Sequence, residues 1–285
     1  GMISTFTHDD ISNPLIRYLM LSDGELTSAP KPMAALRTKA TECGASFGST
    51  VAFSPPAHQP VLDARARELL SLFLDYMWDR TATDSARADM RMVVPHTAFL
   101  QLLDEAEVED LADGDAASSR AKQALDELKR LFTGIPGTPQ GDSDFKIALR
   151  KTCGPTRACI NFHCDGSYAT GTVQVALSDS AEYQGGRLCC FHMKAREEDD
   201  ELVVLERPAG SVCQHATKVL HGVTDLKGGT RKSLFVVDKT NGLGEGGIVQ
   251  ASSRDVTLFL AAWRKDRLEA AKLELEQMRA EQATH

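Results

Sequence analysis

The feature that most constrains the fold is a row of short extended segments between residues 145 and 238. They are rich in Val, Ile, Leu, Phe and Cys, and turn-forming residues separate them. Many short strands without helices between them are typical of an antiparallel sandwich or barrel, because a sheet must cover its apolar face with another layer. The sequence therefore predicts a mainly β fold of the jelly-roll type. The eight expected strands cover residues 145–151, 156–163, 170–178, 186–193, 201–206, 210–214, 217–221 and 231–238.

The segments on either side of these strands have a different character. Residues 1–60 are predicted to be irregular, because any long element is interrupted by Pro30, Pro32, Pro55, Pro56 and Pro60. A short strand is expected at 90–94, and a last helix from Arg254 onward, whose final part is mostly charged. Apolar residues at helical spacing predict further helices at 61–80, 96–112 and 117–132.

This pattern predicts one globular unit with three parts. Residues 1–140 would form a mostly helical region that packs on the core, and a Gly/Pro-rich break at 134–144 marks its end. Residues 141–240 would form the jelly-roll core, and residues 241–285 the C-terminal helix.

Composition narrows the classes of protein to consider. A formal net charge of -8 gives no general attraction for phosphate backbones, so nucleic acid is an unlikely partner. No run reaches the ~20 apolar residues that span a bilayer, so no membrane partner is expected. The start, GMISTFTHDD, lacks the features of a signal peptide, although Gly1 before Met2 looks like a remnant of tag removal and leaves a native targeting segment open. Seven cysteines without a CxxC pair favour a reducing compartment, cytosolic or nuclear.

The chemistry is concentrated in the stretch NFHCDGS, residues 161–167. His163 and Asp165 are two apart at the end of an expected strand, so their side chains point to the same face. A second imidazole, His221, lies 56 positions after Asp165 at the end of another expected strand. Two histidines and one carboxylate on one face of a metal are the facial triad of non-haem iron(II) oxygenases. The sequence therefore predicts a metal site made of His163, Asp165 and His221, which would also be the catalytic centre.

A third element follows at a fixed distance. Arg231 lies ten positions after His221, and a guanidinium can hold a carboxylate through two parallel hydrogen bonds. Ser233, again two residues on, would point the same way and add a hydroxyl donor. This pair is predicted to bind the far carboxylate of a dicarboxylic acid whose 2-oxo end chelates the metal.

HCD, a distal histidine and then RKS resemble the 2-oxoglutarate/iron(II)-dependent dioxygenase superfamily, and the prolyl-4-hydroxylase-like branch within it. The run TGTVQVALSDSAEYQGGRLCCF, residues 170–191, also resembles that branch, and the resemblance covers roughly residues 145–240. It implies a double-stranded β-helix, Fe(II), 2-oxoglutarate as co-substrate and O2, with the need for ascorbate left open. Thr172 would lie near the co-substrate.

The resemblance further implies a hydroxylase that gives succinate and CO2 as co-products. The substrate would be a residue of a protein or peptide, prolyl among them, or a small molecule. The branch usually carries lysine where this chain has Arg231, which puts the prolyl substrate in doubt. Related halogenases carry a small residue at the carboxylate position, so Asp165 favours hydroxylation.

Several alternatives stay open at this point. His215 is a rival for the distal ligand, although its spacing to Arg231 is less suitable. Arg150, Arg157 and Asn161 either reach the mouth of the site or, for the two arginines, lie on a solvated face. A non-catalytic cupin-like module for metal binding or sensing, and an oxygenase that uses another metal or no oxo acid, are the rival functions. The sequence does not predict the oligomeric state.

Overall fold

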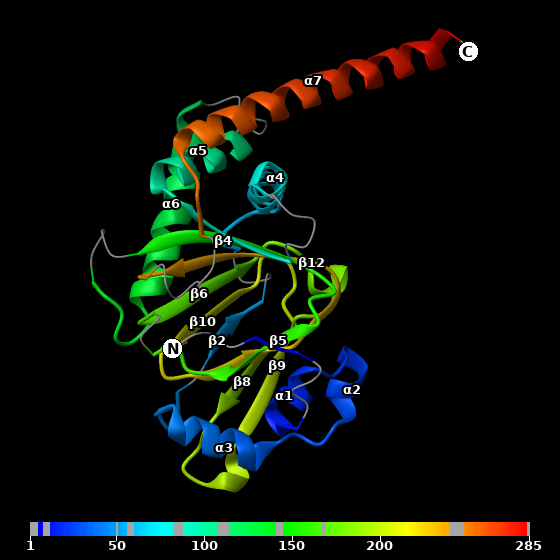
Figure 1. Ribbon diagram of the computed structural model, residues 1–285. Coiled ribbons are helices and arrows are strands. Elements are labelled where there is room, and N and C mark those ends of the chain that lie inside the picture. Colours follow the sequence, from blue (N-terminus) through cyan, green and yellow to red (C-terminus); the bar gives the residue numbers. More distant parts are fainter. Residues whose placement is uncertain are drawn as a thin grey trace.

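Two β-sheets face each other at the centre of the molecule (Figure 1). The computed structural model describes residues 5–7, 12–49, 51–55, 60–81, 88–107, 114–140, 145–166, 169–239 and 248–283. The smaller sheet has the strand order β1 (Thr5–Thr7), β5 (Ala158–His163), β11 (Leu220–Val223), β8 (Leu188–His192) and β9 (Glu201–Leu205). The larger sheet has the order β13 (Ile248–Gln250), β3 (Asp89–Val94), β4 (Lys146–Cys153), β12 (Leu226–Val237), β6 (Gly171–Ala176), β10 (Val212–Ala216) and β2 (Ala52–Ser54), with β7 (Tyr183–Gly185) paired to β12.

The chain winds between the two sheets as it runs through the core. β4, β6, β10 and β12 lie in the larger sheet, and β5, β8, β9 and β11 lie in the smaller one. Among these eight strands every pairing within a sheet is antiparallel. This winding is the double-stranded β-helix, or jelly roll, so the predicted fold class is confirmed.

All eight expected strands are present, with shifted ends. β12 begins at Leu226, five residues before its expected start, because Gly228 and Gly229 concealed it. Gly229 has φ +78, and the register of β12 against β7 shifts between Leu226 and Gly228. Glycines at such an irregularity weaken the strand signal in the sequence.

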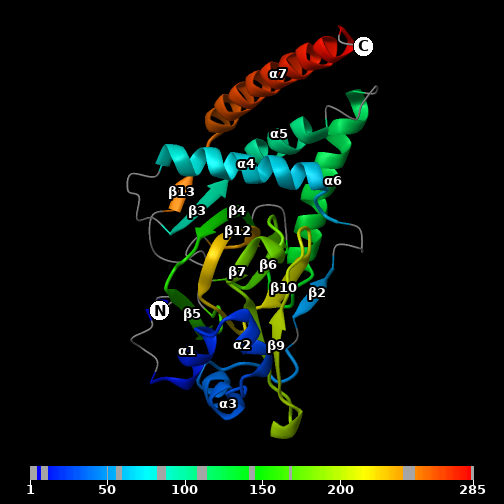
Figure 2. The ribbon, with the colours of Figure 1, turned by 90° about the vertical axis from the view of Figure 1, so that its right-hand side faces the viewer.

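The expectation that residues 1–60 are irregular is wrong for most of the described part. Three short helices lie there, α1 (Pro14–Leu19), α2 (Asp23–Ser28) and α3 (Met33–Glu42), and they gather at the smaller sheet (Figure 2). Pro32, one of the five prolines expected to break an element, is instead the N-cap residue of α3. Pro14 likewise occupies the first turn of α1, where a missing N–H costs nothing. The apolar side chains of these helices form one core with the smaller sheet, which includes Leu19, Leu36, Phe162 and Phe191.

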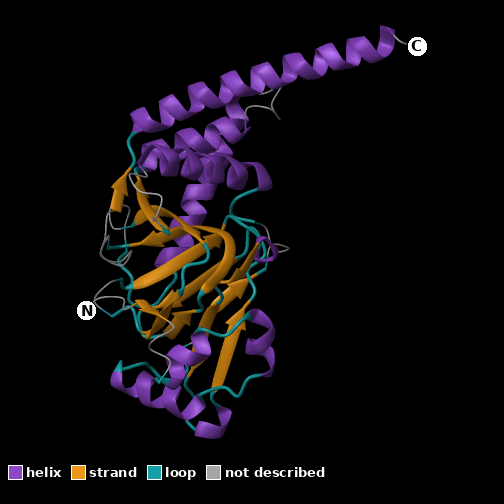
Figure 3. Ribbon diagram, turned by 45° about the vertical axis from the view of Figure 1, so that its right-hand side comes forward, coloured by secondary structure: helices purple, strands orange, loops and turns teal. Residues whose placement is uncertain are grey.

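A second helical layer covers the larger sheet (Figures 1 and 3). It contains α4 (Ala64–Thr81), α5 (His96–Glu107) and α6 (Gly114–Thr133). α7 (Ser253–Ala283) packs here only through its beginning, where Phe259 meets Phe73 with ring centroids 5.3 Å apart, and its distal half projects away from the body. Within the described residues, none of the helices combines the length and apolar character needed to cross a bilayer.

The three-part division at residues 140 and 240 remains a proposal. β1, β2 and β3 come from before residue 141 and β13 comes from after residue 240, so strands from the flanking parts extend both sheets.

The side chain of Asp89 on β3 is hydrogen-bonded to side chains of the neighbouring strand β4. Asp89 accepts hydrogen bonds from Arg150 Nε and Nη2 at 2.8 and 3.2 Å and from Thr152 Oγ1 at 2.8 Å. Arg91 Nε lies 3.0 Å from the same carboxylate. Burial alone would raise the pKa of Asp89, but the charge and hydrogen bonds of Arg150, with Arg91 beside it, hold that pKa at about 2.

We therefore expect Asp89→Asn to lower the free energy of unfolding at pH 7 by about 2 kcal/mol, from 1.36 kcal/mol for each pKa unit. Because the folded-state pKa is depressed, this stabilisation is present above the ordinary carboxyl pKa and is lost as the pH falls. The gap between wild type and variant should shrink between about pH 4 and pH 2. Urea unfolding at several pH values measures it, and a gap that does not change with pH would count against this assignment.

Candidate metal centre

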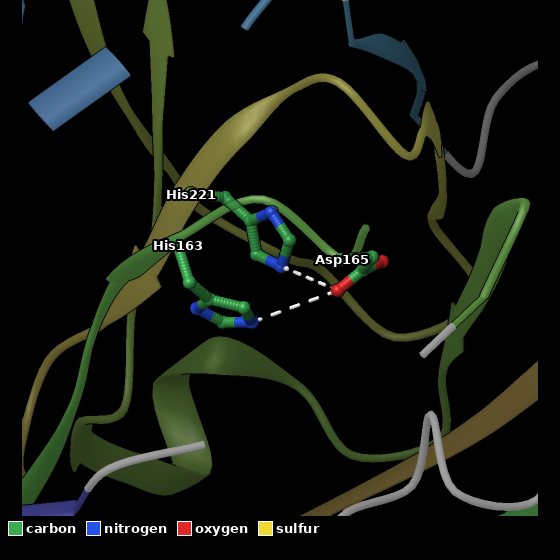
Figure 4. Close-up of side chains that lie close together, drawn as sticks. All are labelled: His163, Asp165 and His221. Carbon is green, nitrogen blue, oxygen red and sulfur yellow. Dashed lines mark ion pairs between the residues drawn. The ribbon is translucent and has the colours of Figure 1, made fainter. Parts of the chain in front are cut away.

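The three predicted ligands lie together between the sheets (Figure 4). His163 and His221 face each other across the antiparallel pair β5 and β11, and Asp165 follows β5 by two residues. The Nε2 atoms of both imidazoles lie 3.6 Å from the same carboxylate oxygen, Asp165 Oδ1. One ligand atom from each residue lies within 4.8 Å of the other two. A single ion can therefore be held by two imidazole nitrogens and one carboxylate oxygen.

Backbone carbonyls fix which ring nitrogen faces Asp165. His163 Nδ1 lies 2.9 Å from the carbonyl oxygen of Asn161, and His221 Nδ1 lies 3.1 Å from that of Val219. A ring nitrogen in this position donates its N–H to the carbonyl, which leaves the Nε2 lone pair for the metal. Both histidines are thus oriented as ligands by their own strands.

The electrostatics of the centre favour the forms that bind a cation. Burial lowers the pKa of His221 to about 3, so its ring is neutral at physiological pH. Burial alone would raise the pKa of Asp165, but the neighbouring histidines, led by His221, hold it below its usual range. A neutral imidazole and an ionised carboxylate are the states that coordinate a divalent metal.

Thr172 holds the other side of the metal carboxylate. Its hydroxyl donates to Asp165 Oδ2 at 3.1 Å, while Oδ1 faces the two histidines. Thr172 also lines the cavity in front of the triad. In this structure its hydroxyl is thus bonded to the ligand Asp165, whereas the resemblance placed it near the co-substrate.

Thr172→Val removes this hydroxyl and keeps the side-chain shape. We expect metal affinity to fall about tenfold or more, since outer-shell partners typically contribute ~10–100-fold. Anaerobic titration with iron(II) measures this, and 2-oxoglutarate affinity at saturating metal should stay near the wild-type value. A variant with unchanged metal affinity and weakened 2-oxoglutarate binding would assign Thr172 to the co-substrate instead.

A third histidine, His215, lies close to the three proposed ligands, although the sequence made it only the less favoured candidate for the distal ligand. His215 is 2 % exposed, its ring centroid is 4.4 Å from that of His221, and its Nδ1 is 3.8 Å from Asp165 Oδ2. Its Nδ1 faces Asp165 Oδ2, the oxygen that accepts the hydrogen bond from Thr172. His215 is not part of the group of ligand atoms formed by His163, Asp165 and His221. His221 is therefore the better distal ligand, and His215 forms part of the cavity wall.

The predicted co-substrate arginine is buried in the same cavity as the triad. Arg231 is 8 % exposed, and its Nη1 donates to the carbonyl of Gly186 at 2.6 Å. Among the described residues, no acidic side chain forms an ion pair with it. Ser233 is buried on the same face of β12, but it is not one of the side chains that line the cavity. Those side chains are Arg150, Ile160, His163, Asp165, Thr172, Gln174, Leu188, His215, His221, Val223, Arg231, Phe235 and Val237.

The other sequence candidates have separate positions. Arg150 lines the cavity, and its guanidinium donates hydrogen bonds to Asp89. The side-chain carbonyl of Asn161 accepts a hydrogen bond from the backbone of Phe162, and Asn161 does not line the cavity. Arg157 follows the β4–β5 turn with φ 55, outside the cavity lining. A larger hollow of about 900 Å³ between α4, α6 and β2 lies away from this centre and contains none of its ligands.

Gln174 was not singled out in the sequence, although a signal for it existed. It lies two residues after Thr172 on β6, and alternation places both side chains on the inner face.

Fold and site together define a double-stranded β-helix protein with a two-histidine, one-carboxylate centre. No protein-family model and no curated protein matches the sequence. Among solved structures, the chain is similar to a Pseudomonas putida prolyl-4-hydroxylase, at 18% identity and TM-score 0.40 over 72% of this chain and 98% of that one. It is also similar to a Trichoplax adhaerens prolyl hydroxylase in complex with a hypoxia inducible factor peptide fragment, at 12% identity and TM-score 0.43 over 77% and 95% of the two chains.

A third similar structure is an oxidoreductase of the 2OG-Fe(II) oxygenase family from Burkholderia pseudomallei, at 16% identity and TM-score 0.37 over 73% of this chain and 90% of that one. At these identities and TM-scores, the likeness does not decide which reaction this chain performs. Function is therefore inferred from the site.

Proposed function

We propose that this chain is an Fe(II)- and 2-oxoglutarate-dependent oxygenase that hydroxylates its substrate. The observation that carries the proposal is the pairing of two features in one cavity. His163 and His221 direct their Nε2 atoms at one oxygen of Asp165. Arg231, whose guanidinium is a buried positive charge, lines the same cavity. A facial triad leaves coordination positions open for a chelating co-substrate and dioxygen.

The residues present fit both groups. Imidazole nitrogens and an ionised carboxylate suit iron(II), and Arg231 supplies the charge that a distal carboxylate needs. When bound, iron and 2-oxoglutarate supply the activation of dioxygen for hydroxylation, with succinate and CO2 as co-products.

The chain's own residues orient the ligand side chains, would bind the co-substrate and exclude water from the cavity. The carbonyls of Asn161 and Val219 orient the histidines, and the Thr172 hydroxyl orients Asp165. Arg231 would bind the far carboxylate of the co-substrate. Leu188 and Phe235 in the cavity wall are buried and apolar, which keeps bulk water from the reacting groups.

For the substrate, we propose a residue of a protein or peptide in the first place, prolyl among them, and a small molecule in the second. We also propose a reducing compartment, cytosol or nucleus. All seven cysteines are free thiols, which agrees with that compartment.

Succinate release tests the reaction. Purified protein is given iron(II), 2-oxoglutarate and oxygen, with and without ascorbate, and without added substrate. We expect slow uncoupled succinate formation that is absent in Asp165→Ala. Equal succinate formation by that variant would contradict the proposal. Binding of metal without binding of 2-oxoglutarate would favour the non-catalytic metal-binding module.

A further inference from the structure

A second buried guanidinium lies beside the cavity. Arg207, on the link between β9 and β10, is 3 % exposed, and its Nη1 donates to Gln174 Oε1 at 3.0 Å. Its Nε and Nη2 atoms are buried and have no hydrogen-bond partner in the described part of the chain. No described carboxylate forms an ion pair with it either. A buried charge without a partner is costly, so an anion bound in the neighbouring cavity would stabilise Arg207.

Gln174 connects this cation to the cavity. Its carbonyl end is bonded to Arg207, so the amide end that remains for the cavity is the NH2 donor. Arg207 therefore determines which way the amide points. A wall residue that would otherwise offer either a donor or an acceptor offers only donors.

The register of the larger sheet places Gln174 along the path from the metal ligands to Arg231. Thr172, which holds Asp165, lies one side-chain row before Gln174 on β6. Gln174 is paired with Phe235 on β12, and Arg231 lies four residues from Phe235 in the direction away from the Thr172 row. A ligand that reaches from the triad to Arg231 passes Gln174.

Positive charges outnumber negative charges at the end of the cavity that contains Arg231. Burial lowers the pKa of Arg231 to about 10, and the nearby positive charges of Arg150 and Arg207 add to that lowering. Asp89 offsets part of this charge through Arg150. An anion that enters relieves the repulsion between the three guanidinium groups.

We propose that Gln174 and Arg207 form a second anchor for the distal carboxylate of a dicarboxylic 2-oxo acid. Gln174 donates a hydrogen bond to the carboxylate, and Arg207 orients Gln174 and adds a second positive charge beside Arg231. The anchor selects dicarboxylic over monocarboxylic 2-oxo acids. This inference rests on the proposed function, since it concerns the same co-substrate.

Gln174→Glu gives the sharpest test. The new carboxylate would gain an ion pair with Arg207, so the melting temperature should equal or exceed that of the wild type. It would also repel the co-substrate, so 2-oxoglutarate affinity should fall on the order of 100-fold, as for a buried like-charge contact. Affinity for 2-oxopentanoate should change by about tenfold or less, because this ligand has no distal carboxylate for the new charge to repel and its remaining carboxylate lies farther away, at the metal. Calorimetry on zinc-loaded protein measures both ligands without turnover.

Two further variants complete the design. Arg207→Met removes the unpaired charge, so it should keep the fold and weaken 2-oxoglutarate by about tenfold while leaving 2-oxopentanoate unchanged. Gln184→Glu, the same substitution at an exposed position on β7, should leave both affinities unchanged.

The outcomes separate this inference from the proposed function. If the wild type binds 2-oxoglutarate and both cavity variants bind it equally well, the second anchor is overturned. The same holds if the variants lose affinity for 2-oxoglutarate and 2-oxopentanoate to the same extent, which indicates a structural role. If the zinc-loaded wild type binds no 2-oxoglutarate, the proposed function itself fails.

Discussion

Asp165→Ala is expected to abolish succinate formation and to weaken iron(II) binding by more than the ~10–100-fold typical of an outer-shell change. The reason is geometric. Asp165 Oδ1 is the one oxygen that both Nε2 atoms approach at 3.6 Å, and without it only the two imidazoles remain as ligands. The loss of the carboxylate also removes the negative charge that offsets the metal in a buried site. Anaerobic calorimetry with iron(II) measures the affinity, and a succinate assay measures turnover.

Asp199→Ala is the matched control for this variant. Asp199 is a half-exposed carboxylate on the link between β8 and β9, where it pairs with Arg196. The control should bind iron(II) with wild-type affinity and form succinate normally. Wild-type turnover in Asp165→Ala itself would rule out the triad as the reactive centre.

Arg231→Ala is expected to raise the 2-oxoglutarate concentration needed for binding on the order of 100-fold or more, since truncating one partner of a buried charge pair typically costs ~2–5 kcal/mol. Arg231 lies in the cavity, and within the described residues its Nη1 bonds to a backbone carbonyl, so the remaining donors are available to a carboxylate. Metal affinity in the absence of 2-oxoglutarate should remain within a few-fold of the wild type. Titration of the metal-loaded protein with 2-oxoglutarate separates the two effects.

Lys232→Ala provides the control on the same strand. Lys232 points to the other face of β12, where its Nζ lies 2.5 Å from Asp75 Oδ2 on α4. Its loss should affect stability and leave 2-oxoglutarate binding unchanged. A normal 2-oxoglutarate dependence in Arg231→Ala would place the co-substrate carboxylate elsewhere.

The grouping of His163, Asp165 and His221 could be predicted because most of its information is local in the sequence. His163 and Asp165 are two residues apart at a strand end, and alternation alone puts them on one face. His221 could be added to the pair only because a second strand was expected to end there. In the structure His221 lies on β11 and is paired with His163 on β5. The eight core strands were visible for the same reason, because a period of two is read from a few neighbouring residues.

What could not be predicted depends on pairing between distant segments. The contact between Arg207 and Gln174 joins residues 33 positions apart, and the approach of His215 to Asp165 follows from the register of β10 on β6. The hydroxyl of Thr172 bonds to Asp165 only in the folded geometry. Short helices in the first 60 residues were missed because a proline at a helix start and a proline that ends a helix look alike in the sequence.

Anaerobic titration of the iron(II)-loaded protein with 2-oxoglutarate, followed by visible absorption, tests the central claim most directly. The arrangement of His163, Asp165, His221 and Arg231 predicts a metal-to-ligand charge-transfer band that saturates at about one equivalent of 2-oxoglutarate. The band should be absent in Asp165→Ala and should require far more 2-oxoglutarate in Arg231→Ala. A wild-type protein that binds iron(II) and develops no such band, or a band that both substitutions leave unchanged, would contradict the assignment of this cavity as the iron and 2-oxoglutarate site.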